Sequence, residues 1–188
     1  MEDFNNVNSI IKLIAKSKLK NGDTVLDATV GNGNDILYLM KIVGENGFGY
    51  GFDIQEVAVK KTRRLLAENA YENNSEIICD GHENLKLYIN KKIDFAVFNL
   101  GYLPKADHSI ITRSDTTIEA IKSIMDILSK TSVIALASYV GHEGGMEEFL
   151  AVKSFVQTLD QKKYNVSIFN FLNQKNSPPK LIIIEKRK

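Results

Sequence analysis

The chain has 188 residues, 44% of them hydrophobic and 25% charged, which fits one ordinary α/β domain and excludes a largely disordered chain. Its 24 Lys and Arg against 23 Asp and Glu give a net charge of +1, so any nucleic-acid contact must come from local patches. The single cysteine, Cys79, excludes an internal disulfide and a cysteine-cluster zinc site and favours a reducing cytoplasm. The acidic and polar residues 1–6 argue against a secretory signal, and no apolar run reaches the roughly 18–20 residues that would cross a bilayer.

Short runs rich in Val, Ile, Leu or Phe alternate along the chain with longer segments of helical period. The chain is expected to open with an extra helix within about residues 4–18, over Val7–Lys18. The predicted strands follow at Thr24–Ala28, Gly49–Asp53, Glu76–Asp80, Asp94–Asn99, Ser132–Ser138, Asn165–Asn170 and Lys180–Glu185. The amphipathic helices between them are predicted at Asp35–Val43, Glu56–Tyr71, Thr116–Lys130 and Gly145–Asp160.

This alternation predicts an α/β fold with a seven-stranded, mostly parallel sheet and helices on both faces. Between the last two strands, the polar residues and the Pro178-Pro179 pair of Phe171–Pro179 stop regular structure. This segment indicates a hairpin-like return and an antiparallel strand at one edge of the sheet. No repeat, low-complexity tract or linker divides the chain, so we expect one domain over residues 1–188.

A turn with two glycines follows the first predicted strand, where ligands of open α/β sheets bind. In Leu26–Asp35, Gly31 and Gly33 would let backbone amides approach a bound molecule closely. A tight strand-to-helix turn without a ligand is the alternative, because a lone Gly-x-Gly is weak evidence.

The ends of the next two strands strengthen the ligand interpretation. Asp53 lies twenty residues after Gly33, and its carboxylate suits a ribose diol, with Ile54 placed to pack against adenine. Asp80 could accept from an adenine amino group and His82 could line the same cleft, although both residues equally fit a turn.

The fourth strand runs into Asn99-Leu100-Gly101-Tyr102-Leu103-Pro104 beside the predicted nucleoside pocket. The Asn99 amide could hold an amine, and the Tyr102 ring could stack on a base. Taken alone, this segment is equally typical of a simple turn.

The glycine turn favours a cofactor without phosphates. A dinucleotide fingerprint needs a third glycine where this chain has Leu37, and Asp35 would repel phosphates. S-adenosylmethionine, with its ribose, adenine, sulfonium and amino-acid end, fits better. The residues predicted to bind it are Asp27, Thr29, Gly31, Asn32, Gly33, Asn34, Asp35, Asp53, Ile54, Gln55, Asp80, Gly81, His82 and Asn99.

The sequence resembles the class I methyltransferases and, within them, a small bacterial group labelled as rRNA methylases. The resemblance covers nearly the whole chain. The segments that carry it are Leu26–Asp35, Asn99–Pro104, Thr116-Thr117, Gly141-His142-Glu143-Gly144-Gly145 and Asn173–Pro179. It implies a seven-stranded Rossmann-like domain, a homodimer, and methylation of the aminomethyl nitrogen of 5-aminomethyl-2-thiouridine at the wobble position in the tRNA anticodon loop.

The amine-binding segment departs from the wider class of amino-methyltransferases. Many of them carry Asn or Asp followed by two prolines and an aromatic residue, whereas this chain has Asn99-Leu100-Gly101-Tyr102. The polar and aromatic ends remain, so Asn99 and Tyr102 are predicted catalytic residues. His142 is the third, because it follows the fifth predicted strand and could accept a proton. The predicted substrate contacts are Gly101, Tyr102, Lys105, Arg113, His142 and Glu143.

Several other polar and charged residues have a structural explanation, and only some of them are candidates for binding. His142 and Glu143 also fit a glycine turn before a helix, and the basic run Lys60–Arg64 is best explained as a solvated helix face. Lys175 and Lys180 are candidates to extend a phosphate-binding patch. No metal is expected, because the three histidines form no tight ligand pair in the sequence.

The sequence leaves three alternative functions open. Class I architecture defines the cofactor site better than the acceptor, so another RNA position is one alternative. A non-catalytic module that binds the cofactor or RNA is a second. A nicotinamide dehydrogenase is a third, disfavoured by Leu37 and Asp35.

Overall fold

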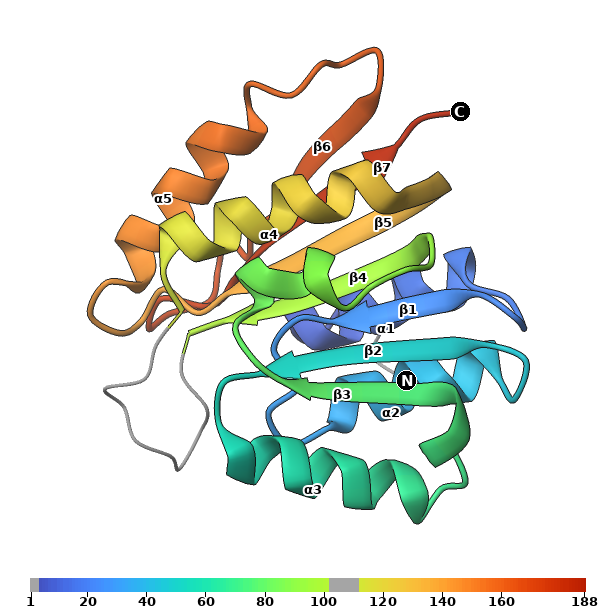
Figure 1. Ribbon diagram of the computed structural model, residues 1–188. Helices are drawn as coiled ribbons and strands as arrows, with labels where there is room; N and C mark the ends of the chain where they lie inside the picture. The colour runs from blue at the N-terminus through green and yellow to red at the C-terminus, as the bar shows by residue number, and fades with distance from the viewer. Residues whose placement is uncertain (1–3, 102–111) are drawn as a thin grey trace.

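The computed structural model describes residues 4–101 and 112–188 and contains one seven-stranded sheet (Figure 1). Its strand order is β3-β2-β1-β4-β5-β7-β6. The strands are β1 Thr24–Asp27, β2 Phe48–Asp53, β3 Ser75–Cys79, β4 Ile93–Leu100, β5 Leu128–Ser138, β6 Tyr164–Phe169 and β7 Lys180–Lys186. The first five strands are parallel, and β7 pairs antiparallel with both β5 and β6. The predicted mostly parallel sheet is confirmed, and its antiparallel strand lies between β5 and the edge strand β6.

Helices cover both faces of the sheet (Figure 1). They are α1 Val7–Lys18, α2 Asn34–Val43, α3 Glu56–Ala67, α4 Ser114–Ile127 and α5 Gly145–Val156, with the short 3₁₀ turns η1 Glu72–Asn74 and η2 His82–Leu87. Apolar side chains of α1, α2 and α3 pack on one face, and those of η2, α4 and α5 pack on the other. Successive strand residues such as Phe95 and Ala96 enter opposite clusters, as the two-residue period of a strand requires.

Three predicted helices end earlier in the structure than in the sequence prediction. The α3 helix ends at Ala67 rather than Tyr71, because Ala70 adopts φ 62° and the Tyr71 N–H turns back to the Leu66 carbonyl. Because buried Leu128 already pairs with Ile93, β5 begins there and α4 cannot reach Lys130.

The α5 helix ends at Val156 rather than Asp160, where the Thr158 hydroxyl donates to the Phe155 carbonyl. At the other end of the chain, α1 spans Val7–Lys18 as its periodicity predicts, and the Asn6 side chain caps it. In the part of the chain that the structure describes, no helix is long and apolar enough to cross a membrane.

Candidate active site

A cavity of about 600 Å³ opens at the carboxyl ends of the parallel strands, where the topology predicts a ligand. It is lined by most of the predicted cofactor residues, namely Thr29, Gly31, Asn32, Asn34, Asp35, Asp53, Ile54, Gln55, Asp80, Gly81, His82 and Asn99. Asp27 and Gly33 lie behind this wall, because Asp27 is buried and Gly33 packs against α3. The sheet therefore brings the ends of four strands to one ligand-sized space.

The glycine turn requires the conformations that only glycine adopts readily. Gly31 has φ 49° and Gly33 has φ 80°. A Cβ on Gly33 would stand 2.9 Å from the Thr62 hydroxyl, and that hydroxyl donates to the Gly31 carbonyl over 3.3 Å. The turn is thus packed directly on α3, which leaves its outer backbone facing the cavity.

Asp53 is held in place before any ligand binds. One carboxylate oxygen accepts from the Gly31 N–H and the other from the Gln55 N–H, each over 2.9 Å. A carboxylate has about four acceptor positions, so two remain for the vicinal hydroxyls of a ribose. Beside it, Ile54 is 58% exposed, an apolar surface available to a purine ring.

The Asp80 carboxylate accepts more hydrogen bonds from within the protein than the sequence suggests. Its carboxylate accepts from the Gly81 N–H, the Asn84 amide and the Tyr88 hydroxyl over 2.7–2.9 Å. The Asn84 and Tyr88 hydrogen bonds lower the pKa of Asp80, so it stays an anion with one acceptor position left.

His82 is buried, and this burial lowers its pKa, so the ring is neutral at neutral pH. Its Nδ1 lies 3.2 Å from the Ala28 carbonyl, which assigns the proton to Nδ1. Its buried Nε2, which has no partner among the described residues, is then an acceptor at the cavity wall.

A buried carboxyl group lies under the glycine turn. Burial, and next the nearby charge of Asp35, raise the pKa of Asp27 well above its ordinary value. Its Oδ1 accepts from the Thr29 N–H, while Oδ2 is buried and has no partner among the described residues. Asp27 therefore stabilises the start of the glycine turn through its hydrogen bond with the Thr29 N–H.

The raised pKa of Asp27 predicts a pH-dependent stability. The folded protein keeps a proton that the unfolded chain releases above the ordinary carboxyl pKa, so the free energy of unfolding falls as pH rises through the folded-state pKa. We expect Asp27→Asn, which cannot ionise, to gain in Tm relative to the wild type as pH rises from 4 to 7. Thermal unfolding of the ligand-free protein measures this gain. The exposed Glu72→Gln is the control, and an equal Tm difference at both pH values would contradict the assignment.

The side of the cavity predicted to hold the methyl acceptor, called the acceptor side below, is built around Asn99 at the end of β4. Its Nδ2 donates to Asp35 Oδ2 over 2.8 Å, and its backbone N–H donates to the Thr29 hydroxyl over 2.8 Å. This arrangement fixes the amide so that Oδ1 is the remaining acceptor. Oδ1 is buried and has no partner among the described residues.

The predicted substrate contacts divide into three groups. Gly101, Arg113 and His142 line the cavity, and the His142 ring lies beside Gly101, since a Cβ there would stand 3.2 Å from Nε2. Glu143 is exposed and does not line the cavity, and Tyr102 and Lys105 fall outside the described residues.

Sequence reasoning missed several residues of the acceptor wall. Asn8 of α1 donates from Nδ2 to the Tyr139 hydroxyl over 3.3 Å, and both side chains line the cavity together with Thr112 and Pro179. Asn8 carries no motif, and only the packing of α1 near the end of β5 brings it there. Pro179 ends the segment Asn173–Pro179, which carries part of the family resemblance, but its position in the site depends on the return from β6 to β7.

The basic run of α3 lies mainly on a solvated helix face, as the sequence predicts, and most of its side chains have partners within the protein. Lys60 pairs with Glu56, Arg64 with Glu68, and the Arg63 guanidinium donates to the Ile77 carbonyl. Lys61 differs, because it donates to Asn32 Oδ1 over 2.7 Å at the cavity rim. Lys180 donates to Asn170, while Lys175 is exposed.

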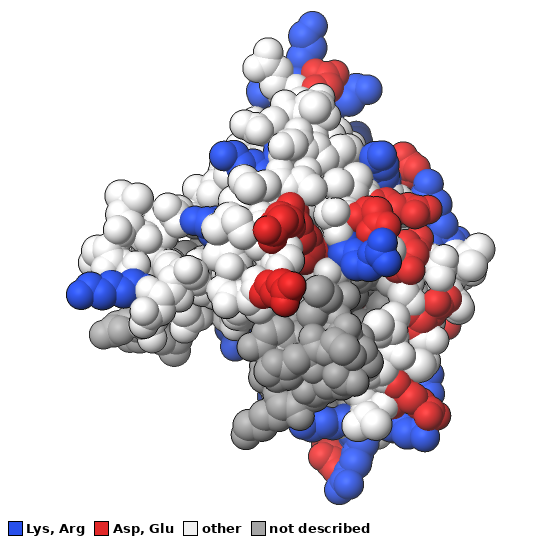
Figure 2. All heavy atoms as spheres, turned by 90° about the vertical axis from the view of Figure 1, so that its left-hand side faces the viewer, with Lys and Arg blue, Asp and Glu red and all other residues white. Residues whose placement is uncertain are grey.

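Lys and Arg side chains lie mainly around the edge of the face onto which the cavity opens (Figure 2). Among the described residues of this face they do not gather into one broad patch. This agrees with the near-zero net charge of the chain.

Comparison with known proteins decides the family. The family model described as "Putative rRNA methylase" matches residues 50–185. The chain belongs to this rRNA methylase family. It is 35% identical, over 95% of its length and 68% of the relative's, to the Arabidopsis thaliana protein named tRNA (mnm(5)s(2)U34)-methyltransferase, chloroplastic.

Two solved structures of similar size share the fold of this family member. A "putative rRNA-methylase" from Clostridium thermocellum is 43% identical with a TM-score of 0.93, over 96% of this chain and 97% of that one. A "putative methyltransferase" from Streptococcus mutans, solved in complex with SAH (S-adenosylhomocysteine), is 37% identical with a TM-score of 0.86, over 96% and 98%. The fold is therefore the Rossmann-like methyltransferase fold that the sequence predicts.

Proposed function

We propose that the chain is a tRNA methyltransferase that transfers a methyl group from S-adenosylmethionine to the aminomethyl nitrogen of 5-aminomethyl-2-thiouridine at the wobble position. The product is 5-methylaminomethyl-2-thiouridine. The observation that carries the proposal is the 35% identity, over 95% of this chain, with a plant relative whose name specifies this wobble nucleoside. The fixed amide of Asn99 supports it, because an amine acceptor needs such a partner.

The donor set of the cavity fits S-adenosylmethionine. Asp53 has two acceptor positions for the ribose, Ile54 provides an apolar surface for adenine, and the Gly31–Asn34 backbone faces the amino-acid end. Bound there, S-adenosylmethionine would supply a sulfonium methyl group that a nitrogen lone pair can attack, so that the C–S bond breaks and S-adenosylhomocysteine leaves. The carboxylates of Asp35, Asp53 and Asp80 around the cavity favour the positive charge of the sulfonium.

Asn99 acts on the acceptor amine. A free alkylamine is largely protonated near neutral pH, by analogy with a Lys pKa of about 10.4, so the site must favour the neutral form. With Nδ2 committed to Asp35, the Asn99 Oδ1 accepts one N–H of the amine and directs its lone pair toward the methyl group. After transfer, the nitrogen carries one surplus proton, which passes to water.

The RNA must present its base in this cavity. The wobble base lies in a single-stranded loop and is inexpensive to unstack. Arg113 and His142 line the acceptor side and are the described residues proposed to contact the flipped nucleotide, and stacking by Tyr102 stays a prediction. A homodimer and a cytoplasmic location also stay predictions, and light scattering tests the first against twice the 21.1 kDa chain mass.

The substrate class is tested with labelled S-adenosylmethionine and two RNA pools, bulk tRNA and ribosomal RNA, from cells that lack this activity. We expect label in the tRNA alone. Label in ribosomal RNA instead would support the description of the family model. Cofactor binding without label in either pool would indicate a non-catalytic binding module.

A further inference from the structure

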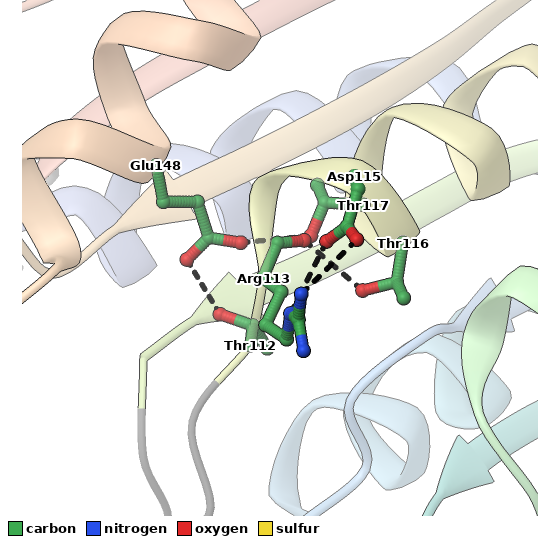
Figure 3. A network of polar contacts seen from close by, with 6 residues as sticks. All are labelled: Thr112, Arg113, Asp115, Thr116, Thr117 and Glu148. Carbon is green, nitrogen blue, oxygen red and sulfur yellow. Dashed lines mark hydrogen bonds and ion pairs between the residues drawn. The ribbon is translucent and has the colours of Figure 1, made fainter.

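Glu148 is a buried acidic residue in the first turn of α5, with 5% of its surface exposed. Its Oε2 accepts from the Thr112 hydroxyl over 2.6 Å, and its Oε1 accepts from the Thr117 hydroxyl over 2.8 Å (Figure 3). No Lys or Arg within residues 4–101 and 112–188 forms an ion pair with it. The two hydroxyl donors and the positive end of α5 compensate the carboxylate for its lost hydration.

Thr112 connects this carboxylate to the end of β4. Its hydroxyl, which donates to Glu148, also accepts from the Gly101 N–H over 3.0 Å. Its own N–H donates to the Gly101 carbonyl over 3.1 Å. Both backbone polar groups of Gly101 are therefore bound by one residue, whose hydroxyl is oriented by Glu148.

The segment that enters α5 also contacts the end of β4. The His142 ring, just before α5, lies against Gly101, while Glu148 in its first turn holds Thr112. Gly101 and Thr112 both line the cavity, and Asn99 lies two residues before Gly101. Hydrogen bonds thus connect Glu148, which does not itself line the cavity, to two residues that do.

We propose that Glu148 is a positioning residue for the methyl acceptor: it orients the Thr112 hydroxyl, which fixes Gly101 and with it the Asn99 end of β4. This inference rests on the proposed function, because it concerns how the same site places its acceptor. An in-line transfer is sensitive to such placement, since a displacement of about 1 Å can reduce the rate about 10²-fold.

The second hydrogen bond of Glu148 provides a matched control. Thr117 is fully buried in α4 and donates to the other carboxylate oxygen, but it makes no hydrogen bond to β4. Thr112→Val and Thr117→Val each remove one hydroxyl from the same carboxylate while keeping the side-chain shape. Thr112→Ser keeps the hydroxyl of Thr112.

The kinetic test compares Glu148→Gln, Thr112→Val, Thr112→Ser and Thr117→Val with the wild type. We expect kcat to fall about tenfold or more in Glu148→Gln and Thr112→Val, with KM for RNA and Kd for S-adenosylmethionine nearly unchanged. Thr112→Ser should restore kcat, and Thr117→Val should keep it even where its Tm falls. Equal losses of kcat in Thr112→Val and Thr117→Val, or no loss in Glu148→Gln, would overturn the proposal.

A substrate-free measurement separates this proposal from the proposed function. Hydrogen exchange of the Gly101 amide, followed by NMR, should be faster in Glu148→Gln and Thr112→Val than in Thr117→Val, because only the first two disturb its acceptor. Unchanged exchange in all three variants would overturn the role of Glu148 whatever the RNA substrate. Absence of wild-type methyl transfer to tRNA, by contrast, would contradict only the proposed function.

Discussion

Replacing Asn99 with alanine is expected to reduce kcat on the tRNA acceptor about 10²-fold or more, while S-adenosylmethionine still binds. The variant loses Oδ1, the acceptor proposed to hold the amine N–H, and it frees Asp35 from its 2.8 Å hydrogen bond. The backbone N–H of Asn99 still donates to Thr29 and that of Gly101 to Thr112, so the end of β4 keeps its place. Single-turnover methyl transfer at saturating cofactor measures the chemical step.

Asn99→Asp tests the same site with the shape preserved. The new carboxylate and that of Asp35 would repel each other, so methyl transfer by this variant should be at least as slow as by Asn99→Ala. The exposed Asn73→Ala, on the turn before β3, is the control and should turn over like the wild type. If both Asn99 variants retain wild-type turnover, the amine is held by other groups and the role given to Asn99 is wrong.

Replacing Asp53 with alanine is expected to weaken S-adenosylmethionine binding about 100-fold, equivalent to about 2.8 kcal/mol. The ribose would lose both of its acceptors, and the Gly31 and Gln55 amides would lose theirs. Isothermal titration calorimetry measures the affinity, with the exposed Glu119→Ala as the control. Unchanged affinity would remove Asp53 from the cofactor site.

A modified ligand separates the ribose contact from loosening of the glycine turn. S-adenosylhomocysteine and its 2′-deoxy analogue should differ in affinity for the wild type, because Asp53 is proposed to bind the 2′-hydroxyl. In Asp53→Ala that difference should disappear, as a double-mutant cycle requires of a direct contact. If the difference persists in the variant, Asp53 acts through the turn alone.

The sheet could be predicted from the sequence because its central strands are buried on both faces. Continuous apolar runs such as residues 95–98 of β4 mark such strands, and their alternation with amphipathic helices allows few topologies. The ends of helices were less predictable, since they depend on particular backbone groups. The left-handed Ala70 and the pairing of Leu128 with Ile93 carry no composition signal.

The cofactor side of the site was predictable for a similar reason. Asp53 and Asp80 stand at strand ends, and parallel strands bring their carboxyl ends to one edge. The acceptor side depends on contacts between distant segments. Glu148 in the first turn of an amphipathic helix is typical of a solvated charge, and its burial arises only where Thr112 meets α5, 36 residues away in the sequence.

The identity of the acceptor nitrogen can be tested directly. Purified protein is incubated with labelled S-adenosylmethionine and tRNA that carries 5-aminomethyl-2-thiouridine, and the nucleosides are then analysed by mass spectrometry. We expect conversion of this nucleoside to 5-methylaminomethyl-2-thiouridine, with the label in the new methyl group. An unchanged wobble nucleoside, with cofactor binding verified in the same sample, would show that the proposed acceptor is wrong.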